Sequence, residues 1–301
     1  MSETPDIRVG RQTIRVSNAD RIMFPDVGVT KGEIVEYYRA VAPAMLPHLR
    51  GRPISMERLP RGIGGEVFFQ KQISSHYPPW IDRVTLPKEG GEVTHVVCNK
   101  AATLVYIANQ NCVTPHVWLS RADDLARPDR LILDMDPGSG GTADARLAAR
   151  LAREVFADLG LASFLMATGS RGFHVVAPIR GTMRFEQVGM IAQRLAEEIA
   201  RRQPDRLTTE FRKADRKGRL FVDYLRNSWA QTAVPPYAVR IRPGATVAVP
   251  LAWDELEDAD PGGWNVRTIL DRLDTNIDPW PGFTRSARSL SRASRRLERL
   301  S

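Results

Sequence analysis

The sequence predicts an α+β protein, and the clearest evidence lies between residues 130 and 225. There a strand, an amphipathic helix, two strands around a glycine turn, a second amphipathic helix and a further strand follow one another. Apolar residues at helical spacing mark the two helices: Leu147, Leu151, Val155 and Leu159, and then Val188, Ile191, Leu195 and Ile199. This order of elements predicts one sheet with both helices on one face.

The part of the chain before residue 120 adds a capped helix and further strands. Thr30 and Glu33 in TKGE match a capping box, so we expect a helix to begin there. Prolines at 43 and 47 are expected to kink or end it. Two strands joined by a glycine-rich turn are expected within residues 51–72, and a strand, a helix and a second strand within 94–117.

No internal repeat or low-complexity linker divides the chain, so we predict a single domain over residues 1–301. Residues 284–301 are predicted to form a basic C-terminal helix or tail. Arginines recur there mainly at steps of three and four residues, which would place them in one stripe on a helix: Arg285, Arg288, Arg292, Arg295, Arg296 and Arg299. The stripe is either a phosphate-binding surface or a solvated helix face.

The composition limits the classes of protein to which the chain can belong. The net charge of +8 at pH 7 favours a polyanionic partner such as nucleic acid. No apolar run approaches the ~18 residues that cross a bilayer, and residues 1–10 lack the pattern of a secretion signal. We therefore expect a cytoplasmic protein without a membrane partner. Two cysteines cannot form a disulfide framework and fit a reducing compartment.

A zinc site is an alternative use of these cysteines. His95, Cys98, Cys112 and His116 follow the spacing H-x2-C-x13-C-x3-H, which four zinc ligands could adopt. A single match of this kind is a weak motif. The same segment is predicted to be a strand, a helix and a second strand, in which buried cysteines are common. Structural cysteines are therefore the favoured interpretation.

The segment LILDMDPGSG places two carboxylates at the end of an otherwise apolar strand. Side chains alternate between the faces of a strand, so Asp134 and Asp136 project together while Met135 points oppositely. Two carboxylates this close repel each other by about 1–4 kcal/mol, and a hard divalent cation removes that repulsion. Asp223 repeats the feature in LFVDYL. Three acids on adjacent strands would form a platform for metal ions, although Asp136 alone could simply begin a turn.

Glycine-rich and basic segments surround these acids. TGSRGFH offers backbone amides, hydroxyls and the side chains of Arg171 and His174, which together can hold phosphate oxygens. An ordinary hairpin turn is the alternative. Arg226 and Arg240 follow Asp223, and so many cations near an acid cluster suit a triphosphate. Two metal ions about 3.5–4 Å apart favour in-line attack at phosphorus, which both nucleotidyltransferases and nucleases use.

Three motifs in this order, LDMDPG, TGSRGFH and FVDYLRN, resemble those of the polymerase domain of bacterial ATP-dependent DNA ligase D, a member of the archaeo-eukaryotic primase superfamily. The resemblance runs from SNADRIMFP to PYAVRIRPG and leaves only the arginine-rich C-terminus outside. It implies a primase-like α+β catalytic core, with mixed or antiparallel, RRM-like sheets flanked by helices.

The resemblance also implies roles for individual residues. Asp134, Asp136 and Asp223 would be catalytic and hold two Mn²⁺ or Mg²⁺ ions. The implied nucleotide-binding residues are Thr168, Ser170, Arg171, His174, His116, Arg216, Arg226, Arg240, Phe68 and Phe69. Core packing is the alternative for the two phenylalanines. The implied ligands of a downstream DNA 5′-phosphate are Arg21 and Lys31. Residues 86–95 occupy the place of a loop that helps relatives bring DNA ends together.

The implied function is template-dependent nucleotidyl transfer, in which NTPs or dNTPs are added to a primer 3′-hydroxyl. The implied substrate is DNA with 5′-phosphorylated gaps or ends, filled during non-homologous end joining with Ku and a DNA ligase as partners. Within the same class, a stand-alone gap-filling polymerase of excision repair or a primase is the alternative. A metal-dependent nuclease and a catalytically silent DNA-binding module are alternatives from other classes.

Overall fold

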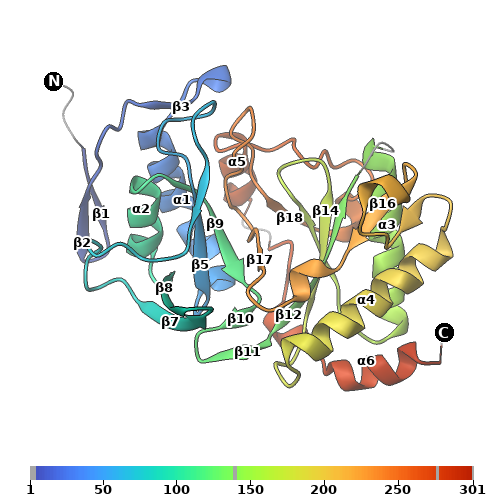
Figure 1. Ribbon diagram of the computed structural model, residues 1–301. Helices are drawn as coiled ribbons and strands as arrows, with labels where there is room; N and C mark the ends of the chain where they lie inside the picture. The colour runs from blue at the N-terminus through green and yellow to red at the C-terminus, as the bar shows by residue number, and fades with distance from the viewer. Residues whose placement is uncertain (1–4, 138–140, 276–277, 300–301) are drawn as a thin grey trace. The chain divides into compact units, whose positions relative to one another are not determined.

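The structure is a computed structural model that describes residues 5–137, 141–275 and 278–299 (Figure 1). The α+β class is confirmed: the chain forms two six-stranded sheets, flanked by helices. Its residues group into two compact units. Unit 1 comprises Met1–Trp118, Thr232–Ala248 and Trp264–Ile277, and unit 2 comprises Leu119–Gln231, Val249–Gly263 and Asp278–Ser301. The single domain expected over residues 1–301 stays a prediction.

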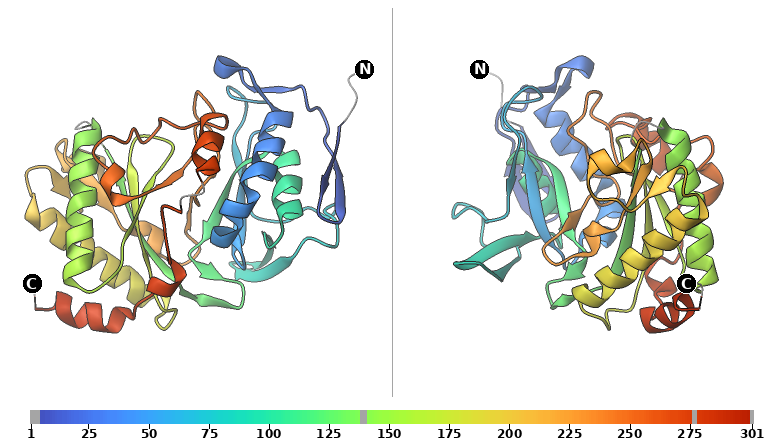
Figure 2. Two further views of the ribbon diagram at one scale, coloured as in Figure 1. Left: turned by 180° about the vertical axis from the view of Figure 1, so that it is seen from behind. Right: turned by 45° about the vertical axis from the view of Figure 1, so that its right-hand side comes forward.

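Unit 1 is built around a sheet with strand order β17-β9-β5-β8-β7, in which β6 also pairs with β5. The strands are β5 (Pro53–Arg58), β6 (Phe68–Gln70), β7 (Arg83–Lys88), β8 (Gly91–Val97), β9 (Cys112–Trp118) and β17 (Thr232–Ala233). Helices α1 (Lys31–Leu49) and α2 (Ala101–Asn109) pack against each other on one face of this sheet (Figures 1 and 2). The remaining elements are β1 (Asp6–Val9), β2 (Gln12–Arg15), β3 (Ile22–Phe24), η1 (Pro25–Val27), β4 (Val29–Thr30) and α5 (Thr268–Asp274).

Helix α1 begins as the sequence predicts but does not end where the prolines suggest. The Thr30 hydroxyl accepts from the Glu33 amide at 3.2 Å, and a Glu33 carboxylate oxygen accepts from the Thr30 amide at 2.8 Å. Pro43 and Pro47 both lie inside the helix, which continues to Leu49. Each proline removes one backbone donor, but the apolar face of the helix is buried on both sides of them. Tertiary packing therefore outweighs the local preference.

The segment 86–95, expected as a loop, is part of a β-hairpin. Strands β7 and β8 pair in register up to Lys88 and Gly91, so only Glu89 and Gly90 connect them. Gly90 has φ of 75°, a conformation that glycine adopts without steric cost.

Unit 2 is built around a sheet with strand order β15-β16-β12-β14-β13-β18. Its strands are β12 (Arg130–Asp136), β13 (Phe164–Ala167), β14 (Phe173–Pro178), β15 (Leu207–Thr208), β16 (Leu220–Asp223) and β18 (Val249–Leu251). Helices α3 (Gly141–Asp158) and α4 (Phe185–Arg202) contact β12 and each other, so both lie on one face of the sheet, as predicted (Figure 1). The remaining elements are β10 (Ser120–Arg121), β11 (Asp124–Pro128), η2 (Lys213–Arg216), η3 (Leu225–Asn227), η4 (Trp253–Glu255), η5 (Thr284–Ser286) and α6 (Leu290–Leu297).

Two details of unit 2 differ from the sequence analysis. Leu147 and Leu151 are only half-buried, whereas the most deeply buried face of α3 carries four alanines: Ala145, Ala148, Ala149 and Ala152. Small side chains allow the helix to lie close to its neighbours. The turn that Asp136 could begin, in the segment PGSGG (137–141), lies mostly outside the described residues, because 138–140 are not among them.

The arginine stripe of the C-terminus is shorter than expected. Arg292, Arg295 and Arg296 lie on α6, whose apolar residues Leu290, Ala293 and Leu297 are buried. Arg285 lies in η5, and the backbone of Arg288 forms an isolated β-bridge with Ile179, so both precede the helix.

Among the described residues, no helix is long and apolar enough to cross a membrane.

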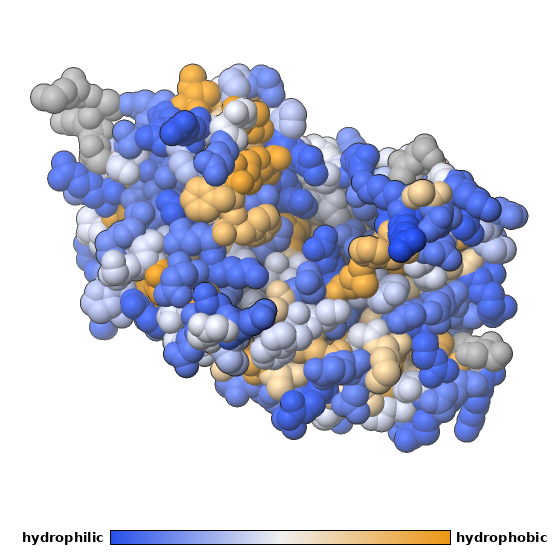
Figure 3. Space-filling view, viewed as in Figure 1, coloured by the Kyte–Doolittle hydropathy of each residue, from blue (hydrophilic) through white to orange (hydrophobic). Residues whose placement is uncertain are grey.

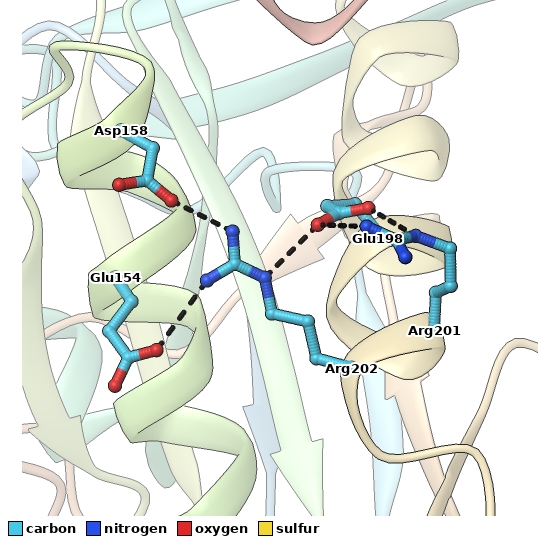
Figure 4. Close-up of polar contacts among 5 residues, drawn as sticks. All are labelled: Glu154, Asp158, Glu198, Arg201 and Arg202. Atoms are coloured by element: carbon cyan, nitrogen blue, oxygen red, sulfur yellow. Dashed lines mark hydrogen bonds and ion pairs between the residues drawn. The ribbon is translucent and has the colours of Figure 1, made fainter. Parts of the chain in front are cut away.

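An ion-pair network joins the C-terminal turns of α3 and α4 (Figure 4). Arg202 donates to Asp158 at 2.8 Å and to Glu198 at 3.0 Å, and lies 3.5 Å from Glu154. Arg201 donates to Glu198 at 2.8 Å. Burial alone would raise the pKa of Glu198, but the hydrogen bonds from Arg201 and Arg202 hold that pKa below its usual value. Arg202 is therefore the cation that ties the two helices together.

We expect Arg202→Gln to lower the free energy of unfolding by about 1–3 kcal/mol, between the values typical of exposed and of buried ion pairs. Arg201→Gln is the matched control, because among the described residues Arg201 forms ion pairs only within its own helix, and its loss should cost less than about 1 kcal/mol. The carboxylate of Glu198 stabilises the fold only while it is ionised. The difference in free energy of unfolding between Arg202→Gln and the wild type should therefore become smaller as the pH falls through the lowered pKa of Glu198. Urea unfolding measures the free energy of unfolding of both variants. Equal losses of that free energy in the two variants would contradict a cross-helix role for Arg202.

Candidate active site

Three neighbouring strands bring polar side chains to one face of the unit 2 sheet. Asp134 on β12 lies directly opposite Asp223 on β16 and opposite His174 on β14. Cross-strand partners project to the same face with Cβ atoms about 4.5–5.5 Å apart. Asp136, two residues along β12, projects to that face as well and lies opposite Phe221. We call this surface the acid face.

The opposite face of β12 forms core. Leu131, Leu133 and Met135 alternate with the acids and are fully buried. Asn227 fixes the edge of β12 near Asp134: its side-chain oxygen accepts from the Ile132 amide at 2.9 Å, and its side-chain nitrogen donates to the Ile132 carbonyl at 2.7 Å. Asn227 belongs to the motif FVDYLRN, and its role was not predicted from the sequence. Asn227 is a polar residue at the end of this motif, and the structure buries it completely.

The carboxylates of Asp134 and Asp223 repel each other. Burial raises the pKa of Asp223, and the charge of Asp134 raises it further. The Leu225 amide donates to Asp223 at 2.7 Å and lowers this pKa, and the charges of Arg226 and His174 lower it as well. The pKa of Asp223 nevertheless stays above its ordinary value, so this pair attracts cations.

Nitrogen atoms of two predicted residues face the same oxygen of Asp134. His174 Nε2 lies 3.4 Å and Arg226 Nε lies 3.8 Å from Asp134 Oδ2. The His174 side chain is buried, and its Nδ1 has no hydrogen-bond partner among the described residues. Buried polar atoms are normally paired, so His174 Nδ1 is an unusual feature beside an acid pair. His174 and Arg226 therefore lie beside Asp134 on the acid face, and their role in nucleotide binding stays a prediction.

Asp136 differs from the other two acids. Its side chain is 57% exposed, and its carboxylate lies 3.3 Å from the Arg171 guanidinium. Among the described residues, no three acidic, histidine or cysteine side chains are already arranged to hold one metal ion. The three aspartates share a face, but only Asp134 and Asp223 are direct cross-strand neighbours. An exposed ion pair such as Asp136–Arg171 is weak, so a stronger ligand can displace it.

The turn between β13 and β14 lies directly against β12. The Thr168 hydroxyl donates to the Gly172 carbonyl at 2.9 Å and closes the turn, which contains Ser170 and Arg171. A Cβ atom at Gly172 would lie 2.1 Å from the Met135 carbonyl oxygen, so only glycine fits there. This close approach explains why the second motif lies beside the acids. Thr168 is engaged in the turn, which leaves Ser170 as the half-buried hydroxyl of this motif.

Arg216 reaches the acid face through an aromatic contact. Its guanidinium carbon lies 4.3 Å from the centroid of Phe221, whose cross-strand partner is Asp136. The same guanidinium donates to the backbone carbonyls of Glu210 and Phe211 at 3.0 and 2.8 Å. The structure therefore gives Arg216 a role in shaping the segment before β16.

Unit 1 holds a second group of predicted residues. His116 on β9 and Glu57 on β5 are joined at 3.1 Å, and the Phe69 ring lies 5.2 Å from the His116 ring. Burial alone would raise the pKa of Glu57, but the hydrogen bond and charge of His116 lower it, and the charge of Arg240 contributes. Glu57 thus orients His116.

Phe68 and Phe69 are exposed rather than packed in the core, with 36% and 55% of their surface accessible. Figure 3 shows apolar side chains gathered near β3 and β6 on this face of unit 1. The Arg58 guanidinium lies 5.4 Å from the Phe68 ring centroid. The core-packing alternative is therefore wrong, and both rings remain available for stacking.

Lys31 is a buried cation, although sequence alone would place it at the surface. It is 2% exposed, and its ammonium group donates to the Ser17 carbonyl at 2.6 Å and to the Ser17 hydroxyl at 3.0 Å. Burial lowers the pKa of Lys31 to about 8, and the charges of Arg21 and Arg58 act in the same direction. Arg21 donates to the Pro60 carbonyl at 2.6 Å. Within the described chain, no carboxylate pairs with Lys31, so this cluster of three cations suits an anion.

The alternative zinc site does not form among the described residues. His95 Nδ1 lies 3.0 Å from the Ile54 carbonyl, and the Cys98 thiol donates to the Lys100 carbonyl at 3.7 Å. Burial raises the pKa of both thiols, that of Cys98 to about 12, so thiolate ligands are unfavourable. His116 is instead bound to Glu57.

Comparison with known proteins identifies the family. The model of the LigD primase-polymerase domain matches residues 30–280 of this chain. The chain belongs to the LigD primase-polymerase domain family. This is a family of DNA-directed nucleotidyltransferases, and its fold agrees with the α+β architecture of the structure. All predicted site residues except Arg21 lie within the matched residues, whereas α6 lies beyond them.

Individual relatives of the LigD family agree with this assignment. The chain is 32% identical over 266 residues to the multifunctional non-homologous end joining protein LigD of Mycolicibacterium smegmatis, covering 87% of this chain and 35% of the relative. It is 33% identical over 293 residues to the LigD protein of Pseudomonas aeruginosa, covering 96% of this chain and 35% of the relative. The chain therefore spans about a third of the length of these curated relatives.

A solved structure has the same fold. The polymerase domain from Mycobacterium tuberculosis ligase D, determined in complex with DNA, matches with a TM-score of 0.85 and 32% sequence identity. The match covers 91% of this chain and 99% of the solved chain. Nearly all of the LigD polymerase domain is therefore represented here.

We expect Asp223→Asn to raise the free energy of unfolding of the metal-free protein at neutral pH by about 1 kcal/mol, because it removes repulsion between two like charges. A raised pKa means that ionising Asp223 destabilises the folded state. The gain should therefore disappear as pH falls below the unfolded pKa of about 3.9. Urea unfolding as a function of pH measures this, and Asp205→Asn, at an exposed acid, is the control. A loss of stability at neutral pH would contradict the repulsive pair.

Proposed function

We propose that this chain extends a primer on a DNA template by nucleotidyl transfer from NTPs or dNTPs, with Asp134, Asp136 and Asp223 as ligands of two Mg²⁺ or Mn²⁺ ions. The observation that carries the proposal is the direct cross-strand opposition of Asp134 and Asp223 on the acid face. Their carboxylates provide hard oxygen donors. Burial and, to a lesser extent, the charge of Asp134 raise the pKa of Asp223, and bound cations would offset both effects.

Bound divalent ions would lower the pKa of the attacking 3′-hydroxyl and neutralise charge on the phosphates. The remaining chemistry falls to this chain's own residues. Arg171 and Arg226 lie beside the acids and would hold phosphate oxygens, while Ser170 and the backbone of its turn would orient them. His174 would donate to a phosphate or sugar oxygen. Catalysis in this proposal is largely positioning and charge neutralisation.

Other predicted residues complete the proposal. Thr168 and Arg216 would support the nucleotide site through the segments that they hold, and His116 and Arg240 would contact the nucleotide. Phe68 and Phe69 would stack on bases, since both rings are exposed. Arg21 and Lys31 would bind the 5′-phosphate at a gap.

The pathway proposed is the filling of short gaps and DNA ends in non-homologous end joining, in the bacterial cytoplasm at the nucleoid, with Ku and a DNA ligase as partners. The names of the bacterial relatives support it. Gap filling in excision repair or priming would use the same site. A metal-dependent nuclease is the rival from another class, because an acid pair with metal ions also serves hydrolysis.

Primer extension tests the reaction. We expect the wild-type chain, with Mn²⁺ and NTPs or dNTPs, to lengthen a labelled primer on a template. Replacement of Asp134 and Asp136 together by alanine should abolish extension and leave DNA binding within about twofold, because the metal ligands are lost but the basic surfaces are not. Asp205→Ala is the control. Shortened labelled strands would support the nuclease, and undiminished extension by the double variant would refute the site.

Thermal unfolding tests the metal ligands without any assay of activity. Mn²⁺ should raise the melting temperature of the wild-type chain, because a ligand that binds only the folded state stabilises it. Asp223→Asn should remove most of that rise, whereas Asp205→Asn should keep it. An equal rise in both variants would place the metal elsewhere.

Binding to gapped DNA tests the 5′-phosphate ligand. Lys31→Ala should reduce the preference for a 5′-phosphorylated gap by about tenfold. A tenfold change in affinity corresponds to about 1.4 kcal/mol, which is the size expected for one charge-assisted contact. Because the pKa of Lys31 is about 8, raising the pH from about 7 to about 9 should weaken the same preference in wild type. Lys88→Ala, at an exposed lysine, is the control. Equal losses on phosphorylated and unphosphorylated gaps would argue against this assignment.

A further inference from the structure

One segment of unit 2 combines an exposed aromatic ring with unpaired cations. Phe211 is 68% exposed. It precedes Arg212 and Lys213, and Lys217 follows at the left-handed end of η2. The side chains of all three cations are exposed and have no hydrogen-bond or ion-pair partner within the described chain. We call residues 210–219 the basic aromatic loop.

The backbone of the basic aromatic loop is held in place by its two remaining arginines. Arg216 donates to the carbonyls of Glu210 and Phe211 at 3.0 and 2.8 Å. Arg219 donates to the carbonyls of Arg216, Pro204 and Asp215 at 2.9, 3.3 and 3.4 Å. Of the five cations, two therefore shape the loop and three are left for a ligand. The fixed backbone presents Phe211 to solvent in a prepared position, which lowers the entropy lost on binding.

The loop is attached to the acid face. The Arg216 guanidinium lies 4.3 Å from the Phe221 ring centroid, and Phe221 is the cross-strand partner of Asp136. Strand β16, which leaves the loop, ends at Asp223. Both connections belong to unit 2. A ligand on the loop would therefore lie beside the proposed catalytic acids.

We propose that the basic aromatic loop binds a single-stranded stretch of the nucleic-acid substrate, with a base stacked on Phe211 and neighbouring phosphates paired with Arg212, Lys213 and Lys217. This inference rests on the proposed function for the identity of the substrate. An isolated exposed apolar residue needs no explanation, but an aromatic ring flanked by unpaired cations is the combination that single strands require. Duplex bases are already stacked and offer no face to Phe211, so a single strand is the occupant that fits.

Equilibrium binding of the intact chain to an oligothymidylate of about a dozen nucleotides tests the stacking contact. Metal ions and nucleotides are omitted, so the result does not depend on nucleotidyl transfer. Phe211→Ala should weaken binding about tenfold, within the range for one aromatic stack. Phe211→Trp should bind as well as wild type, and Phe211→Leu should behave like Phe211→Ala because leucine lacks a π-face. Binding that is unchanged in Phe211→Ala, or restored by leucine, would overturn the proposal.

The phosphate contacts have their own control on the same unit. Replacing Arg212, Lys213 and Lys217 by serine should reduce the salt slope of binding by about 2, since each single-strand phosphate contact contributes about 0.7. The matched variant replaces three exposed arginines elsewhere on unit 2: Arg153, Arg180 and Arg184. It removes the same charge and should leave the slope nearly unchanged. Equal reductions in the two variants would show a general charge effect and overturn the assignment to the loop.

Two further arms separate this inference from its rivals. In the double variant Asp134→Asn with Asp223→Asn, oligothymidylate binding should still depend on Phe211. This result is expected whether or not the wild-type chain extends a primer. Failure of the loop can therefore be distinguished from failure of the proposed function. Vesicles containing phosphatidylserine test the other polyanion that a basic aromatic surface suits. Phe211-dependent binding to vesicles, with oligothymidylate binding independent of Phe211, would overturn the proposal in favour of a lipid surface.

Discussion

The register of β12 places two like charges directly opposite each other on adjacent strands of unit 2, and core packing maintains that register. Asp134 and Asp223 share a register position, and a slip of one residue in β12 would turn both of its aspartates to the face covered by α3 and α4. The apolar side chains on the other face resist such a slip, since Leu131, Leu133 and Met135 are fully buried. Core packing therefore offsets an electrostatic repulsion that local preferences would avoid.

Two further contacts keep β12 in this position. Asn227 pairs with both backbone groups of Ile132, and Gly172 lies so close to Met135 that no larger residue fits. Neither residue carries out chemistry. Both restrict where the acids and the turn of the second motif can lie, which is the support that a precisely arranged site requires. The acids of β12 and the turn of the second motif therefore lie together because their backbones pack against each other.

Alternation along strands and helices was enough to predict the sheet of unit 2, its two helices and the shared face of the acids, because these follow from short-range periodicity. Other features depend on contacts between distant residues. Helix α1 continues through Pro43 and Pro47 because its neighbours bury it. Lys31 is buried, and the Ser17 carbonyl and hydroxyl accept its hydrogen bonds. The ion pair of Asp136 with Arg171 and the support of His116 by Glu57 likewise join segments far apart in sequence. No local pattern encodes these contacts.

The distribution of partners among the cations separates structural roles from binding roles. Arg202 is surrounded by Glu154, Asp158 and Glu198, so its charge is already neutralised within the protein. Lys31 is as clearly placed, but backbone and hydroxyl oxygens are its partners, and its lowered pKa shows that its charge is only partly compensated. A cation held without a carboxylate costs stability, and that cost is recovered only when an anion binds. The same reasoning, applied to exposed cations fixed beside an aromatic ring, marks a surface for polyanions rather than a solvated loop.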